Sequence, residues 1–242
     1  MRCVLRRVRY LGQLLAGRSV FDSTLYREAE LARLANLFAH VDIDRWTGLR
    51  ILEVGAGLGR IGDAFRYLGF DVTSTDGRPE HVDRMRYRGC NAFILDLDSV
   101  HAEDFAGYDI VLAFGVLYHL REPERFLTSC GENARVLLLE SCVSDSTQLD
   151  IPKVKEKTGW RGQDQALHAV GCRPSPTAIE RACKNAGFDV IRDISSPIAN
   201  WSQGRFDWEP RGNGEWRRED MNLRRMWICE RSSKLTSSPR DR

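Results

Sequence analysis

Residues suited to binding a nucleoside gather in the segment RILEVGAGLGRIGDAF, residues 50–65. Two glycine patterns overlap there. Read from Glu53, the pattern is E-x-G-x-G-x-G and ends at Gly59. Read from Gly57, it is G-x-G-x-x-G and ends at Gly62, the spacing of dinucleotide-binding turns. The first pattern suits an adenosyl ligand without a pyrophosphate, and the second suits NAD.

The preceding strand favours the first pattern. Its apolar run ends at Val54, so the turn begins at Gly55, whereas a turn starting at Gly57 would leave two residues unexplained. Glu53 can face a cationic ligand or anchor the glycine loop, but it is unfavourable beside a pyrophosphate. A carboxylate at Asp76, after the next strand, can accept hydrogen bonds from both ribose hydroxyls. The cofactor contacts expected in this region are Glu53, Gly55, Ala56, Gly57, Gly59, Asp76 and Gly77, with Gly62 packing a helix against a strand.

Alternating apolar and amphipathic segments must position these residues. The alternation predicts βαβ units and a parallel sheet, whose ligand lies at the carboxyl ends of the strands. The strands are expected at residues 50–54, 70–76, 92–97, 108–117, 134–142, 188–194 and 225–231, and the helices at 21–41, 61–68, 79–87, 124–130 and 175–187. The first helix has an apolar pattern at Leu31, Leu34, Leu37 and Phe38, with Ser23 or Asp22 as its cap.

Two segments, residues 143–174 and 195–222, interrupt this alternation. Both follow the carboxyl ends of strands, so we expect them over the ligand site. They are rich in tryptophan, and rings such as Trp160 and Trp208 could enclose an acceptor; an accessory core is the alternative. We expect residues 1–48 to form a helical segment, residues 49–231 one domain with these two insertions, and residues 232–242 a disordered tail.

Several segments in order resemble the motifs of class I S-adenosylmethionine-dependent methyltransferases: LEVGAGLGR, VTSTDGRPE, FILDLDSV and YDIVLAFGVLYHLREPERFL. The last resembles the subgroup with a G-V-L-Y-H-L segment. The resemblance covers about residues 50–231. It implies a Rossmann-like α/β fold with a doubly wound, mostly parallel seven-stranded sheet whose last strand is antiparallel. It also implies S-adenosylmethionine as the cofactor. Asp96 would meet the adenine amino group beside the Leu97 backbone, with Asp98 as the competing residue, and Phe114 and Gly115 would lie near the methyl group.

Candidate catalytic and acceptor-binding residues lie after the fourth strand and in the first insertion. His119 follows the fourth strand and could remove a proton from the acceptor, or have a structural or cofactor-orienting role. His168, in the insertion, is a second candidate base. Glu140, near the end of the fifth strand, could orient the substrate or a base. Asp164 and Arg173 are candidate substrate contacts.

Composition limits the possible partners. Net charge is +2, from 36 basic and 34 acidic residues, which argues against a nucleic-acid partner. The seven scattered cysteines favour reduced thiols in a cytoplasmic protein, and no apolar run reaches the ~20 residues of a membrane span. The spacing shows no clustered metal ligands, so we expect no metal. His40, His81 and His101 are expected at the surface.

The combined interpretation is a methyltransferase that uses S-adenosylmethionine. Its acceptor would be a small molecule or a glycan precursor, methylated at oxygen, nitrogen or carbon under the two insertions. A tRNA-modifying methyltransferase is the alternative acceptor class. An NAD(P)-dependent oxidoreductase and a catalytically silent cofactor-binding module are alternatives of other classes.

Overall fold

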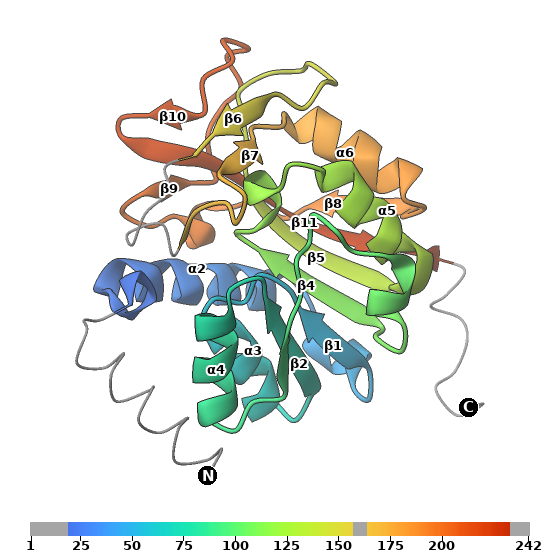
Figure 1. The fold of residues 1–242 in the computed structure, drawn as a ribbon. Helices are drawn as coiled ribbons and strands as arrows, with labels where there is room; N and C mark the ends of the chain where they lie inside the picture. The colour runs from blue at the N-terminus through green and yellow to red at the C-terminus, as the bar shows by residue number, and fades with distance from the viewer. Residues whose placement is uncertain (1–18, 157–163, 233–242) are drawn as a thin grey trace.

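A mostly parallel sheet forms the centre of the protein (Figure 1). The structure, a computed structural model, describes residues 19–156 and 164–232. The main strands are β1 (Arg50–Glu53), β2 (Asp71–Asp76), β3 (Ala92–Ile94), β4 (Ile110–Phe114), β5 (Val136–Cys142), β8 (Val190–Asp193) and β11 (Met221–Glu230). They lie in the order β3-β2-β1-β4-β5-β11-β8, and β11 is antiparallel to both of its neighbours. The doubly wound sheet with an antiparallel last strand is therefore confirmed.

Helices cover both faces of this sheet, because successive strand residues point to opposite sides. Ile51 and Ile110 pack on one face with α2 (Thr24–His40) and α3 (Arg60–Tyr67). Leu52 and Val111 pack on the other face with α5 (Pro123–Asn133) and α6 (Pro176–Asn185). A further helix, α4 (Pro79–Tyr87), packs beside β2 and β3 at the edge of the sheet.

Both insertions contain short strands of their own. The first holds a hairpin of β6 (Lys153–Lys155) and β7 (Val170–Cys172). The second holds β9 (Gly204–Arg205) and β10 (Arg217–Arg218), which pair with the first residues of β11 and bring the sheet to nine strands. The last strand therefore begins at Met221, earlier than the predicted residue 225. Figure 1 shows the four short strands together at the end of the molecule beyond α2.

Helix α2 meets the protein with a mixed face, and the predicted apolar pattern holds only in part: Leu37 is buried and Leu34 packs against the same core. Leu31 is 68% exposed and Phe38 is 39% exposed, whereas Arg33 and Asn36 are buried. Asn36 donates a hydrogen bond of 2.9 Å to the carbonyl of Ile194, so its burial is compensated. The start of the helix is as predicted, because the Ser23 hydroxyl accepts from a backbone N–H of the first turn.

Other expectations concern the whole chain. The six described cysteines are free, as predicted, and five of them are buried. Among the described residues, no helix has both the length and the apolar character needed to cross a bilayer. The predicted tail lies outside the described residues except for Ser232.

Candidate active site

The glycine turn after β1 has the geometry of the E-x-G-x-G-x-G pattern. Gly55, Gly57 and Gly59 have φ angles of 60°, 56° and 70°, a region that favours glycine. Gly62, which only the dinucleotide pattern requires, lies inside α3 instead. The turn therefore consists of the three glycines that the adenosyl interpretation selected.

Glu53 holds the first turn of α3, which follows the glycine turn, against β2. Its carboxylate accepts hydrogen bonds from the backbone N–H of Gly62, at 2.9 Å, and from the hydroxyl of Ser74, at 2.6 Å. Burial raises the pKa of Glu53 to about 7. A Cβ added to Gly62 would lie 2.3 Å from Glu53 Oε2. Gly62 is thus the packing residue that we expected, and a side chain at this position would have to displace the Glu53 carboxylate.

Asp76 ties the glycine turn to α4. Its carboxylate accepts from the backbone N–H of Gly57 at 2.8 Å and of Arg78 at 2.9 Å, and it contacts Nδ1 of His81 at 3.0 Å. His81 is only 2% exposed, so its predicted surface position was wrong; α4 turns this side chain toward the site. Asp76 also lines the cavity above the turn, and a carboxylate has about four acceptor positions. The Asp76 carboxylate can therefore still accept a hydrogen bond from a ribose hydroxyl.

A first cavity lies at the carboxyl ends of β1, β2 and β4. Most of the expected cofactor contacts line it: Glu53, Gly55, Ala56, Asp76, Gly77, Asp96, Leu97, Phe114 and Gly115. Gly57 and Gly59 do not line this cavity, and they contribute through the backbone shape of the turn. The first insertion closes one side through Asp164, Gln165 and Leu167.

The structure distinguishes Asp96 from Asp98. The carboxylate of Asp98 accepts from the backbone N–H groups of Arg121, at 2.7 Å, and Glu122, at 3.1 Å, so it fixes the start of α5. Asp96 accepts from the backbone N–H of Asp98 at 3.1 Å, and its other oxygen lies 2.8 Å from Nε2 of His168. Asp96 has the more exposed side chain of the two carboxylates, 32% against 2%. These contacts favour Asp96 as the ligand-facing residue.

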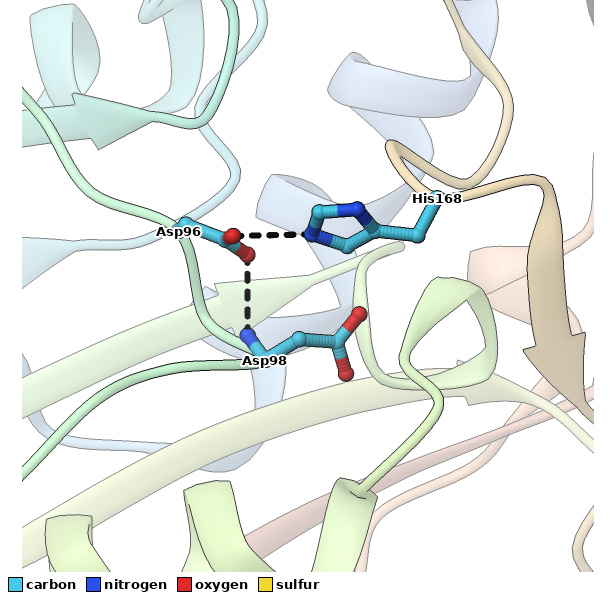
Figure 2. A group of neighbouring side chains, drawn as sticks. All are labelled: Asp96, Asp98 and His168. Atoms are coloured by element: carbon cyan, nitrogen blue, oxygen red, sulfur yellow. Dashed lines mark hydrogen bonds and ion pairs between the residues drawn. The ribbon is translucent and has the colours of Figure 1, made fainter.

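Asp96, Asp98 and His168 also form a group that could hold a metal ion, with their ligand atoms within 4.8 Å of one another. The expectation of no clustered metal ligands was therefore wrong, because the insertion brings His168 across the site. Figure 2 shows His168 directed at Asp96, while the carboxylate of Asp98 lies below the imidazole ring and takes no part in that contact. Since protein groups already bind these oxygens, the contacts favour a hydrogen-bonding role for the group.

A second cavity, of about 340 Å³, adjoins the first. The two share Tyr26, Arg33, Tyr118, His119, Asp164 and Gln165. Tyr26 and Arg33 come from α2, and the Tyr26 hydroxyl donates to Asp164 of the first insertion at 2.5 Å. The sequence analysis assigned no site residue to α2. The sequence offered one signal, which was the polar side chain of Arg33 on the face of α2 that proved to be buried.

His119 stands where the two cavities meet. Its Nδ1 lies 2.7 Å from Oε2 of Glu156, which also accepts from the backbone N–H of Ala166 at 2.7 Å. Burial opposes ionisation of Glu156, but its contacts with His119, the Ala166 N–H and Arg173 together outweigh this and lower the pKa of Glu156. Glu156 lies in the first insertion and was missed, because no motif surrounds it. The carboxylate fixes the ring and leaves Nε2 as the nitrogen for a proton.

Glu140, which was predicted to orient the substrate or a base, contacts two arginines that line the second cavity. It is fully buried, and its carboxylate lies 3.1 Å from Nε of Arg33 and accepts from Nε of Arg224. Burial opposes ionisation, but Arg224 and Arg33 outweigh it, so the pKa of Glu140 is lowered. Glu140 lines neither cavity. Its link to the second cavity therefore runs through Arg33 and Arg224.

The tryptophans of the insertions divide between core and cavity. Trp208 is 7% exposed, belongs to the core and donates through Nε1 to the carbonyl of Arg224 at 3.1 Å, so its predicted contact with the acceptor is corrected. Trp201 and Trp216 line the second cavity in its place, together with the predicted Arg173. Trp160 lies outside the described residues.

The chain is similar to several proteins that are named as methyltransferases. A model described as methyltransferase domain matches residues 23–193. A ubiquinone biosynthesis O-methyltransferase of Mesorhizobium japonicum is 22% identical over 198 residues, 77% of this chain and 74% of that protein. A second enzyme of that name, from Cereibacter sphaeroides, is 32% identical over 90 residues, 35% of this chain and 36% of its own. A tRNA U34 carboxymethyltransferase of Pseudomonas putida is 26% identical over 180 residues, 69% of this chain and 52% of that protein.

Solved structures share the fold. The N-terminal domain of EvdMO1 with S-adenosylhomocysteine bound has a TM-score of 0.63 and 21% identity, covering 83% of this chain and 80% of that one. The glycopeptide N-methyltransferase MtfA complexed with S-adenosylmethionine has a TM-score of 0.52 and 17% identity, covering 83% of this chain and 86% of that one. With the family model matched over most of the chain, the oxidoreductase alternative falls away. The chain belongs to the methyltransferase domain family, and it is an S-adenosylmethionine-dependent methyltransferase.

Proposed function

We propose that this enzyme methylates a hydroxyl oxygen or an amine nitrogen of a small molecule or glycan precursor held in the second cavity. The observation that carries the proposal is the position of His119, which lines both cavities and is held by Glu156 at 2.7 Å. A proton acceptor at the junction of a cofactor site and a second cavity suits a nucleophile that loses its proton during transfer.

The residues of the first cavity fit the cofactor. Asp76 is available to the ribose and Asp96 to the adenine amino group, while the positive φ angles of the glycine turn let the ligand approach the backbone. Arg33 lines both cavities and offers a guanidinium to a carboxylate. When bound, S-adenosylmethionine supplies an electrophilic methyl group.

The pair of His119 and Glu156 would then manage the proton. The Glu156 carboxylate accepts from Nδ1–H of His119, which fixes the tautomer whose Nε2 is basic. As Nε2 takes the acceptor proton, the ring becomes positive, and the buried carboxylate stabilises that charge. Tyr26, Tyr118, Trp201 and Trp216 give the second cavity the partly aromatic lining that is common in small-ligand sites.

A tRNA acceptor is the second candidate, because two of the similar proteins are named tRNA U34 carboxymethyltransferase. The balanced net charge weighs against it. The cavity of about 340 Å³ also lies within the range of about 300–1,000 Å³ found for small-ligand pockets.

Kinetics of two variants test the proposal, using an acceptor found by labelled methyl transfer into a metabolite extract. His119→Ala should lower kcat by about 100-fold or more, the low end of general-base effects, and leave affinity for S-adenosylhomocysteine within ~3-fold. Glu156→Gln should lower kcat less and shift the pH profile, because the amide stabilises the charged ring poorly. If His119→Ala left kcat unchanged at every pH, His119 would not be the general base.

A further inference from the structure

The second cavity is lined by more guanidinium groups than carboxylates. Arg33, Arg173, Arg217 and Arg224 line it, but only Asp164 among the acidic residues does. They come from α2, the first insertion, β10 and β11, so residues distant in sequence converge on one space. Such a lining needs counter-charges, either from the protein or from a ligand.

The protein supplies too few counter-charges. Glu140 serves both Arg33 and Arg224, so one buried carboxylate faces two guanidinium groups. Glu156 lies 3.5 Å from Arg173 and is shared with His119. Counting these two carboxylates and Asp164, the protein places three negative groups against four guanidinium groups, and a cofactor carboxylate on Arg33 would still leave Arg217 without a counter-charge.

Of the four guanidinium groups, that of Arg217 most clearly lacks a counter-charge from the protein. Among the described residues, no carboxylate lies within ion-pair distance of its guanidinium. It is exposed, and it lines the cavity from β10 with its guanidinium 5.1 Å from the centre of the Trp216 ring. Arg224 is 3% exposed; it uses Nε and Nη2 on Glu140 and Nη2 on the Tyr118 hydroxyl. Its Nη1 has no protein partner in the described part of the chain, and that donor remains for a ligand.

Aromatic rings hold these guanidinium groups in place. The Trp201 ring has Arg33 and Arg224 each 5.0 Å from its centre, and the Trp216 ring has Arg173 at 4.7 Å. Stacking restricts the side chains before any ligand arrives, so less conformational entropy is lost on binding. Planar, preoriented guanidinium groups match the oxygens of carboxylate and phosphate.

We propose that the acceptor carries an anionic oxygen group, a carboxylate or a phosphate, and that Arg217 and Arg224 bind this group while the nucleophile faces His119. The inference rests on the proposed function for the choice of the second cavity as the acceptor site. It adds the chemical class of the acceptor. Both residues lie outside the first cavity, so the anion site is separate from the cofactor site.

Binding of small probes tests this without turnover. Protein saturated with S-adenosylhomocysteine is titrated calorimetrically with phenyl phosphate, benzoate and the neutral benzamide. At least one anionic probe should bind at least ~10-fold more tightly than benzamide, as expected for charge-assisted hydrogen bonds. The anion that binds more tightly shows whether the site prefers a phosphate or a carboxylate. Equal affinity for all three, or no binding of either anion at about 10 mM, overturns the inference.

Variants locate the anion. Arg217→Gln and Arg224→Met should each weaken the preferred anion at least ~5-fold and leave benzamide within ~2-fold. Arg224→Met leaves Glu140 paired with Arg33, so no buried charge is orphaned. The matched control is Arg205→Gln, on β9, which pairs with Asp207 and does not line the cavity. If neither variant lowers the affinity for the anion more than the control does, the anion does not bind Arg217 and Arg224. Retained affinity for S-adenosylhomocysteine shows that a variant is folded.

The two proposals fail in different ways. If the anions bind as expected but only tRNA is methylated, the proposed function fails and the anion site remains. If a neutral small molecule proves to be the acceptor, with KM unchanged in Arg217→Gln, this inference fails and the proposed function remains.

Discussion

Replacing Glu53 with glutamine should change how stability depends on pH. Glu53 is fully enclosed beneath the glycine turn, and burial raises its pKa from 4.5 to about 7. The folded protein therefore holds this proton more tightly than the unfolded chain does. The stability that Glu53 contributes is fully present below pH 4.5 and is lost as pH rises through 7.

The size of the effect follows from these two values. Each pKa unit corresponds to about 1.36 kcal/mol, so the change from 4.5 to about 7 corresponds to about 3 kcal/mol. Glu53→Gln removes this dependence because an amide does not titrate. Its oxygen can still accept from the N–H of Gly62, and its NH₂ can donate to the Ser74 hydroxyl.

Urea unfolding from pH 4.5 to 8 measures the effect. The free energy of unfolding of the wild type should fall by about 3 kcal/mol relative to Glu53→Gln across this range. The control is the same substitution at the exposed Glu103, which should follow the wild type. Parallel curves for wild type and Glu53→Gln would refute the reasoning about the buried carboxyl.

Three further predictions concern the turn, the ribose anchor and the tryptophans. Gly62→Ala should lower affinity for S-adenosylhomocysteine at least ~5-fold in calorimetry, because the added Cβ would lie 2.3 Å from Oε2 of Glu53. Unchanged affinity would show that the Glu53 side chain can move without disturbing the site. Asp76→Ala should lower that affinity at least ~10-fold, since hydrogen bonds to a charged group contribute about 1.5–3 kcal/mol, and Asp76→Asn should lose less; equal losses would contradict this. Trp208→Ala should cost about 3–5 kcal/mol of stability, whereas Trp216→Ala should mainly raise the acceptor KM. Thermal melting and kinetics of both variants separate the two effects, and a Trp208→Ala protein as stable as the wild type would refute the place of Trp208 in the core.

The parts of the site that could be predicted depend on local sequence. The turn from Gly55 to Gly59 follows one strand directly, and Asp76 ends the next, so short-range pattern and strand order place them together. Asp96 was placed by the family resemblance of the segment FILDLDSV. The antiparallel last strand came from the family resemblance, since periodicity does not reveal strand direction.

The parts that could not be predicted depend on contacts between distant segments. Arg33 lines both cavities because α2 crosses the site, and Glu156 reaches His119 because the β6–β7 hairpin folds over it. Neither residue has a local pattern that marks it. Trp208 was chosen by residue type alone, and type does not separate a core ring from a cavity ring such as Trp216.

The central claim is methyl transfer to a small molecule in the second cavity, and the destination of a labelled methyl group tests it most directly. The enzyme is incubated with S-adenosylmethionine that carries a deuterated methyl group, in parallel with an RNA-free metabolite fraction and with purified tRNA, and both are analysed by mass spectrometry. The account predicts a labelled small anionic metabolite whose formation depends on His119, with no label in tRNA. Label confined to tRNA nucleosides would contradict it.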